Sequence, residues 1–176
     1  MPHVILVDEN DNQIGTGEKL DVHQKGLLHR CFSICVFNQK GEMMLQQRDK
    51  NKYHSGGLWT NTCCRHPESD EDTEAAALRR LKEDLGFDCD LEEVFSFNYR
   101  APLDNGITEH EFDHTFFGFY DGEPTLNPEE AMNWKWMSLD NLQAELEKKP
   151  QEYTYWLKEM LPKVIELRKN EKTTSN

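Results

Sequence analysis

The amino-acid sequence predicts an α/β or α+β sandwich, in which mixed β-sheets are flanked by helices. Two observations support this fold class: short apolar segments with strand composition recur along the chain, and segments with helical periodicity lie between and after them. With 176 residues the chain is long enough for one well-buried core. We therefore predict a single domain over residues 1–176, with a disordered tail at about residues 170–176.

The N-terminal part of the chain contains three predicted strands. Residues 4–7 are apolar, and the sequence DENDN that follows is rich in the Asp and Asn residues that favour turns. A longer, mostly apolar run at residues 30–37 predicts the second strand. The sequence NQKGE, which contains Gly41, then supplies a hairpin turn, so that residues 43–47 return as the partner strand.

A polar loop and the clearest helix follow. Residues 48–57 form a loop with four cationic side chains: Arg48, Lys50, Lys52 and, when protonated, His54. After the acidic sequence SDEDT, Asp72 or Thr73 can cap a helix that ends at Gly86. Its predicted buried stripe consists of residues at helical spacing: Ala77, Leu78, Leu81 and Leu85.

The C-terminal half is predicted to contain further strands and two helices. Strands are predicted at residues 94–99, 111–120 and 133–137, with the first two joined through a DNG turn at residues 104–106. Residues 138–148 and 153–169 have helical character, and Pro162 is expected to interrupt the second helix because proline lacks a backbone N–H.

Composition excludes several classes of protein. The net charge of −13 argues against a general nucleic-acid-binding protein, which needs a basic surface. A mean hydropathy of −0.84 leaves no candidate membrane span, and the N-terminus has no positively charged region before a long apolar stretch, so we expect no signal peptide. The five cysteines, an odd number without a CxxC pair, fit a reducing compartment. We therefore expect a cytoplasmic protein.

Two short segments carry groups that can form one reactive site. The sequence TNTCCRHP contains a thiol and an imidazole two residues apart, at Cys64 and His66, and TEHEF contains two carboxylates at the same spacing, Glu109 and Glu111. In extended chain, residues at this spacing face the same side. Together they offer a thiol acid or base, a carboxylate acid or base, and metal ligands.

The helix after SDEDT resembles part of a family motif. The stretch from Arg65 to Phe87 is similar to the Nudix box, and seven positions match in type and spacing: Glu71, Arg79, Leu81, Glu83, Asp84, Gly86 and Phe87. Two positions depart from the motif, because Arg65 stands where the box has Gly and Arg80 replaces the first helix Glu. Nudix hydrolases use those helix carboxylates to gather Mg²⁺ on a diphosphate, so an Arg among them weakens a hydrolase interpretation.

The departures fit one branch of that superfamily. With TNTCCRHP before the box and NYRA and EHEF after it, residues 3–160 resemble the type I isopentenyl-diphosphate isomerases. The resemblance implies a Nudix-type sandwich and an acid and base pair, Cys64 and Glu111, that moves the double bond between isopentenyl and dimethylallyl diphosphate. It also implies that Tyr99 assists proton movement and that the ring of Trp156 stabilises a tertiary carbocation.

The same resemblance implies two metals and a set of cations. Three histidines and two glutamates would bind Zn²⁺ or Mn²⁺: His23, His29, His66, Glu109 and Glu111. Mg²⁺ would arrive with the substrate diphosphate and use Asp84 and the backbone carbonyl of Cys64. Four basic residues would bind the diphosphate: Lys19, Arg48, Lys52 and Arg80. The implied partner is a small prenyl diphosphate, and the oligomeric state stays open.

Other interpretations of these residues exist. Taken alone, Cys64 is more often a small buried hydrophobe than a catalyst, and Trp156 could pack in a core with its apolar neighbours. Two alternative functions use the same fold: a Nudix hydrolase of a diphosphate substrate, and a non-catalytic Nudix-like binding module. Neither requires the thiol, the tyrosine and all metal ligands together, and their joint occurrence in order favours the isomerase.

Overall fold

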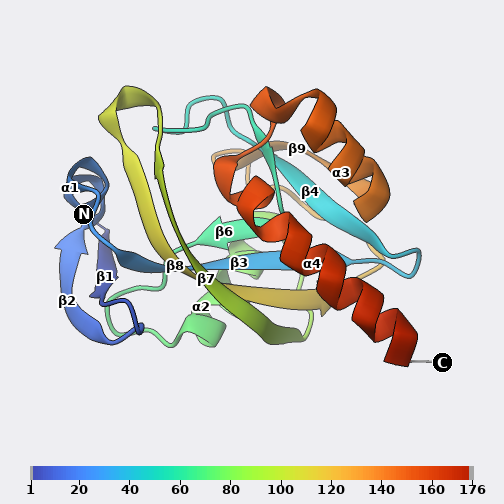
Figure 1. The fold of residues 1–176 in the computed structure, drawn as a ribbon, viewed down its shortest axis with the longest axis horizontal. Coiled ribbons are helices and arrows are strands. Elements are labelled where there is room, and N and C mark those ends of the chain that lie inside the picture. Colours follow the sequence, from blue (N-terminus) through green and yellow to red (C-terminus); the bar gives the residue numbers. More distant parts are fainter. Residues whose placement is uncertain (1, 175–176) are drawn as a thin grey trace.

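The structure is a computed structural model that describes residues 2–174 (Figure 1). Its strands are β1 His3–Val7, β2 Gln13–Glu18, β3 His29–Phe37, β4 Glu42–Arg48, β5 Trp59–Thr60, β6 Cys63–Arg65, β7 Leu91–Pro102, β8 Thr108–Phe119 and β9 Ala131–Ser138. Its α-helices are α1 Lys19–Lys25, α2 Thr73–Leu85, α3 Leu139–Lys148 and α4 Tyr155–Thr174, and short 3₁₀ helices lie at Asp104–Gly106 and Pro150–Glu152. In this part of the chain, no helix is long and apolar enough to span a membrane.

The strands form one mixed sheet that is organised around β3 and β4. β1 pairs with β2 and contacts the start of β3, while β4 pairs with β5 and β9. β8 runs parallel to β3 over its whole length and forms a long antiparallel hairpin with β7. In this register His29 lies opposite Glu111, so the sheet itself brings two of the predicted metal ligands together.

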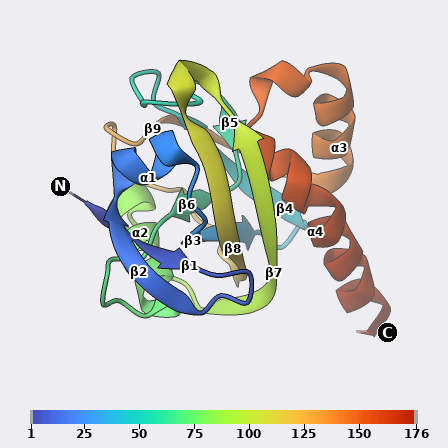
Figure 2. The ribbon, with the colours of Figure 1, turned by 60° about the vertical axis from the view of Figure 1, so that its left-hand side comes forward.

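Helices cover both sides of the sheet, as Figure 2 shows for α2 and α4. On one side, Leu81 and Leu85 of α2 pack with Phe32 and Ile34 of β3. On the other side, the apolar face of α4 packs with residues of β3 and β4. Because consecutive side chains of β3 point to opposite faces, this strand contributes to both cores. The predicted α+β sandwich with helices flanking mixed strands is confirmed.

Helix α2 follows the prediction at both ends and departs from it in one core residue. Asp72 caps the helix by accepting from the Ala75 amide at 3.1 Å, and Gly86 ends it with φ 74°. Leu78, which we expected in the buried stripe, is 37% exposed, and Ala76 is buried in its place. The reason is that the sheet covers the face of Ala76 and Ala77, whereas Leu78 lies a further 100° around the helix.

Several other elements differ from the prediction. β2, β5, β6 and α1 were not predicted. α1 is capped by the Glu18 side chain, which accepts from two amides, and ends at Gly26 with φ 65°. α4 continues through Pro162, because buried residues before and after the proline pack against the sheet. α4 also extends to Thr174 through part of the tail for which we expected disorder, and residues 175 and 176 lie outside the described residues.

Candidate active site

Four predicted metal ligands meet at one end of the sheet. His23 comes from α1, His29 from the start of β3, His66 from the segment after β6, and Glu109 from β8. Each offers one ligand atom, and these atoms all lie within 4.8 Å of one another. The fifth ligand, Glu111, lies next to them, with Oε2 at 3.1 Å from Nε2 of His66.

Backbone carbonyls orient two of the imidazoles. Nδ1 of His23 lies 2.6 Å from the carbonyl oxygen of Lys19, and Nδ1 of His29 lies 2.9 Å from that of Leu27. An imidazole that donates from Nδ1 keeps the Nε2 lone pair for a metal. Nε2 of His29 is buried and has no hydrogen-bond partner among residues 2–174, and Oε1 of Glu109 faces Nε2 of His23, as expected of ligand atoms. The cluster fits a divalent metal ion.

Burial sets the charge states of this cluster. It lowers the pKa of His23 to about 4 and that of His66 to about 3, so both imidazoles are neutral at physiological pH. Burial and the neighbouring charge of Glu111 raise the pKa of Glu109 well above its usual range. For Glu111 burial acts in the same direction, but hydrogen bonds from Glu109 and His66 outweigh it and hold its pKa well below the usual range.

Tyr99 and Glu111 are in direct contact. They lie opposite each other on β7 and β8, and the Tyr99 hydroxyl donates a hydrogen bond to Oε1 of Glu111. The same hydroxyl lies 3.5 Å from Oε2 of Glu109. Tyr99 is 6% exposed and borders the cleft with Glu111. The structure therefore places the predicted tyrosine where it can pass a proton to or from the carboxylate.

Cys64 enters the same cleft from β6. Its sulfur lies 3.0 Å from Oγ of Ser33 and 3.2 Å from Oδ1 of Asn61. Burial raises the pKa of the Cys64 thiol, so the sulfur carries its proton at neutral pH. The neighbouring Cys63 points to the opposite face of the strand, toward the core under α2, with its sulfur 3.6 Å from Asp84. Of the two cysteines, Cys64 is thus the one that can donate a proton into the cleft.

One cleft brings most of the predicted site residues together. It is lined by seven of them beside the metal ligands His66 and Glu109: Lys19, Arg48, Lys52, Cys64, Tyr99, Glu111 and Trp156. Arg48 is held by the carbonyl oxygens of His54 and Ser55, and its guanidinium carbon lies 5.2 Å from the centre of the Trp156 ring. The cleft therefore has an aromatic wall beside a cationic one.

His54 differs from the sequence-based interpretation. We counted it among the loop cations, but the side chain is buried, and burial lowers its pKa to about 2. Nε2 of His54 lies 3.6 Å from Oε1 of Glu109, and its ring packs against Trp156 with centroids 5.9 Å apart. His54 is therefore a neutral wall of the cleft. The sequence held no signal of this, because burial of a loop residue depends on the tertiary fold.

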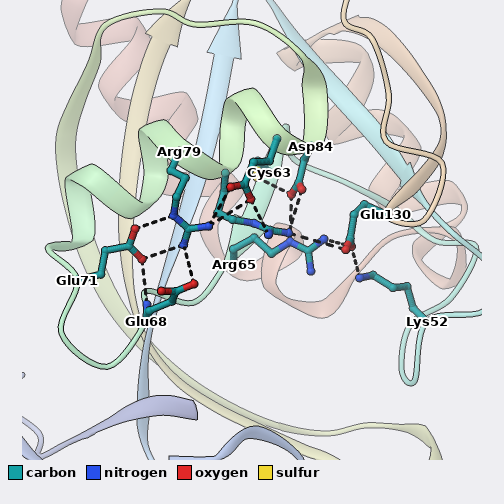
Figure 3. Close-up of polar contacts among 10 residues, drawn as sticks. Lys52, Cys63, Arg65, Glu68, Glu71, Arg79, Asp84 and Glu130 are labelled. Atoms are coloured by element: carbon teal, nitrogen blue, oxygen red, sulfur yellow. Dashed lines mark hydrogen bonds and ion pairs between the residues drawn. The ribbon is translucent and has the colours of Figure 1, made fainter. Parts of the chain in front are cut away.

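Asp84 forms ion pairs with arginine side chains, and Figure 3 shows its contact with Arg65. The Asp84 carboxylate pairs with Nε of Arg65 at 3.0 Å and with a terminal nitrogen of Arg80 at 2.9 Å. Arg80 borders a separate groove, which it shares with Lys19 and Arg65. Glu130, which the sequence analysis missed, lies beside these cations. The two motif mismatches, Arg65 and Arg80, were the sequence signals that pointed to this cluster.

Comparisons with known proteins agree with this geometry. The family model described as NUDIX domain matches residues 27–160. DR0079 from Deinococcus radiodurans superposes with a TM-score of 0.77 at 18% identity, covering 92% of this chain and 98% of that one. A MutT protein from Methanosarcina mazei superposes with a TM-score of 0.67 at 17% identity, covering 81% and 96%. These likenesses establish a Nudix fold.

Two curated relatives define the branch. Isopentenyl-diphosphate Delta-isomerase 2 of Aromatoleum aromaticum is 52% identical over 165 residues, which cover 94% of this chain and 87% of the relative. Isopentenyl-diphosphate Delta-isomerase 2 of Photorhabdus laumondii is 51% identical over 158 residues, covering 90% and 89%. The chain therefore belongs to the isopentenyl-diphosphate Delta-isomerase family within the Nudix superfamily.

Proposed function

We propose that this protein interconverts isopentenyl diphosphate and dimethylallyl diphosphate by proton transfer between Cys64 and Glu111. The reaction protonates an unactivated alkene carbon and removes a proton from a carbon two positions along. One acid and one base are needed. The observation that supports this assignment is a protonated thiol and an ionised carboxylate in one cleft, the second in contact with the Tyr99 hydroxyl.

The walls of the cleft suit the intermediate that this reaction forms. Protonation of the alkene leaves a tertiary cation, which water would trap. Trp156 is 3% exposed and lines the cleft, so its ring can stabilise the cation by about 1–2 kcal/mol without forming a bond to it. Glu111, in contact with the Tyr99 hydroxyl, would take up the proton that the cation loses.

Metals and cations position the diphosphate and the base. The ligand set of three imidazoles and two carboxylates suits Zn²⁺ or Mn²⁺, which when bound supplies positive charge that orients Glu111. Four cations are assigned to the diphosphate: Lys19, Arg48, Lys52 and Arg80. Mg²⁺ would enter with the diphosphate, and its predicted protein ligands, Asp84 and the carbonyl of Cys64, stay a prediction. A reducing compartment such as the cytoplasm suits the thiol.

The first test is NMR of the metal-loaded protein with isopentenyl diphosphate and Mg²⁺ in D₂O. Dimethylallyl signals should grow with deuterium incorporation, and a chelator should stop them. Cys64→Ala should lower turnover by at least about a thousandfold while the circular dichroism spectrum stays unchanged, because removal of a proton donor costs several kcal/mol of transition-state stabilisation. Cys63→Ala is the matched control, since its thiol faces the core under α2.

Two outcomes would contradict this function. Release of phosphate without isomerisation would indicate a Nudix hydrolase. Unchanged substrate in folded, metal-loaded protein would indicate a binding module. Equal turnover in Cys64→Ala and the unaltered protein would leave the isomerase class intact but remove Cys64 from the proton transfer.

A further inference from the structure

Arg65 lies between two carboxylates at the edge of the cleft (Figure 3). Its Nε donates to Oδ2 of Asp84 at 3.0 Å, and one terminal nitrogen forms an ion pair with Glu130. Lys52 forms an ion pair with the same oxygen of Glu130. The side chains of Arg65, Lys52 and Glu130 are 14%, 15% and 19% exposed, so solvent and solutes can reach this cluster.

Arg65 belongs to the cleft that holds Cys64 and Glu111. It lines that cleft with Lys19, Arg48 and Lys52, whereas the cleft's own glutamates, Glu109 and Glu111, face the histidines. Burial, followed by the charge of Arg65, lowers the pKa of Lys52 to about 7 and that of Lys19 to about 8. Four cationic side chains that repel one another favour a ligand with several negative charges.

The Asp84 carboxylate pairs with two arginine side chains. One of its oxygens faces Arg65 and the other faces Arg80. A dication placed directly on Asp84 would lie against two guanidinium groups, which is electrostatically unfavourable. The pairs instead fix the orientation of Arg65. Ligation of Mg²⁺ by Asp84 would have to displace one of these pairs.

We propose that Arg65 is a further diphosphate-binding residue, and that the substrate's diphosphate displaces Glu130 from Arg65 and Lys52. Asp84 keeps its bond to Nε and acts as a positioning residue, while the terminal nitrogens of Arg65 turn from a carboxylate to phosphate oxygens. The guanidinium fork matches phosphate as well as it matches carboxylate, so the exchange conserves its charge-assisted hydrogen bonds. This inference rests on the proposed function, which supplies the diphosphate.

Calorimetric titration of the metal-loaded full chain with inorganic pyrophosphate tests the exchange. Arg65→Gln should weaken pyrophosphate binding by about tenfold to a hundredfold, and Arg65→Lys by less, because lysine keeps the charge but not the fork. Glu130→Gln should tighten binding by about two- to fivefold, because it removes the competing carboxylate. Arg79→Gln is the control: Arg79 belongs to the same network but pairs with Glu71, outside the cleft, so affinity should stay within about twofold.

The direction of the change in pyrophosphate affinity distinguishes the proposed exchange from misfolding of a variant. A misfolded variant cannot bind more tightly, so the Glu130→Gln result reports the exchange itself. Unchanged affinity in Arg65→Gln, or weaker binding in Glu130→Gln, would overturn the proposal. Isomerase kinetics on the same samples should show a raised KM for isopentenyl diphosphate in Arg65→Gln with a smaller change in kcat. If the unaltered protein binds pyrophosphate but yields no dimethylallyl product, the proposed function fails while the diphosphate site stands.

Discussion

Ser33 links the reactive thiol to a buried carboxylate that the sequence analysis did not consider. Its hydroxyl donates to Oδ2 of Asp113 at 2.6 Å and lies 3.0 Å from the sulfur of Cys64. Asp113 is 1% exposed and also accepts from the Thr115 hydroxyl at 3.2 Å. Burial raises the pKa of Asp113 to about 7, although its hydrogen bond with Ser33 acts in the opposite direction. The cleft thus contains a second carboxyl group that titrates near neutral pH.

This raised pKa makes a prediction about stability. A carboxyl group with a higher pKa in the folded state holds its proton more tightly there, so its contribution to the free energy of unfolding falls as pH rises from about 4 to about 7. Asp113→Asn removes this dependence. The difference in free energy of unfolding, variant minus unaltered protein, should rise by roughly 2–3 kcal/mol between about pH 5 and about pH 8. Urea unfolding of the metal-free proteins measures it. A difference that does not vary with pH would contradict it.

At the scale of elements, the predictions succeeded where local signals decide the structure. Asp72 and Gly86 defined α2, because capping and left-handed backbone are local properties. β2 and α1 were missed, since QIGTGE lacks the apolar alternation of a strand and α1 has only 7 residues. The parallel pairing of β3 with β8 could not be read from the sequence, because it joins segments about 80 residues apart.

The same division applies to the site. The resemblance supplied the histidines, glutamates and cysteine, and the structure brings them together. The resemblance could not predict contacts between side chains that are far apart in the sequence and are brought together by the tertiary fold. Two examples are the contact of His54 with Trp156 and that of Arg65 with Glu130. These contacts depend on loops and on the ends of elements, whose positions follow from packing rather than from local sequence preference.

Pro162 in the interior of α4 gives a prediction at this scale. Proline has no N–H to donate to the carbonyl of Lys158 and costs up to about 3 kcal/mol in a helix interior. Its side chain is exposed, so replacement leaves no cavity. Pro162→Ala should therefore raise the free energy of unfolding by about 1–3 kcal/mol in urea unfolding followed by circular dichroism.

The matched control for this substitution is Pro150→Ala. Pro150 begins the short helix Pro150–Glu152, where no N–H is required. Pro150→Ala should not raise the free energy of unfolding. Pro150 costs nothing in the native backbone, and it restricts the conformations of the unfolded chain. A loss of stability in Pro162→Ala would mean that the proline ring itself packs favourably at this position.

For the molecule as a whole, the distribution of charge matters more than its sum. The net charge is −13, yet the cleft is lined by Lys19, Arg48, Lys52 and Arg65. The negative surface disfavours nucleic acids and other polyanions that need a broad basic face, while a small anion can enter the positive cleft. β3, β6 and β8 all contribute residues to the lining of this cleft, because β6 and β8 each pair with β3. The prediction of a single domain stays a prediction, and unfolding in one cooperative transition would support it.

Buried neutral histidines make the metal-free protein sensitive to acid. Burial lowers the pKa of His23 to about 4, of His66 to about 3 and of His54 to about 2, whereas the unfolded chain binds these protons near pH 6.5. The unfolded state therefore gains these protons first, and the contribution of the three histidines to the free energy of unfolding falls as pH decreases below about 6.5. The raised pKa values of Asp113 and Glu109 act in the opposite direction, so the histidine contribution is isolated by comparing a variant with the unaltered protein.

Urea unfolding of the chelator-treated protein at several pH values measures this dependence. His54→Asn removes a side chain that binds a proton in this range only in the unfolded state, and His54 is not among the proposed metal ligands. Relative to the unaltered protein, the free energy of unfolding of the variant should therefore rise by about 2 kcal/mol between about pH 7.5 and about pH 5. A histidine on the surface has the same pKa in both states, so a neutral, buried position is what this rise reports. A difference between the two proteins that does not vary with pH would show that His54 binds its proton in the folded protein as readily as in the unfolded chain.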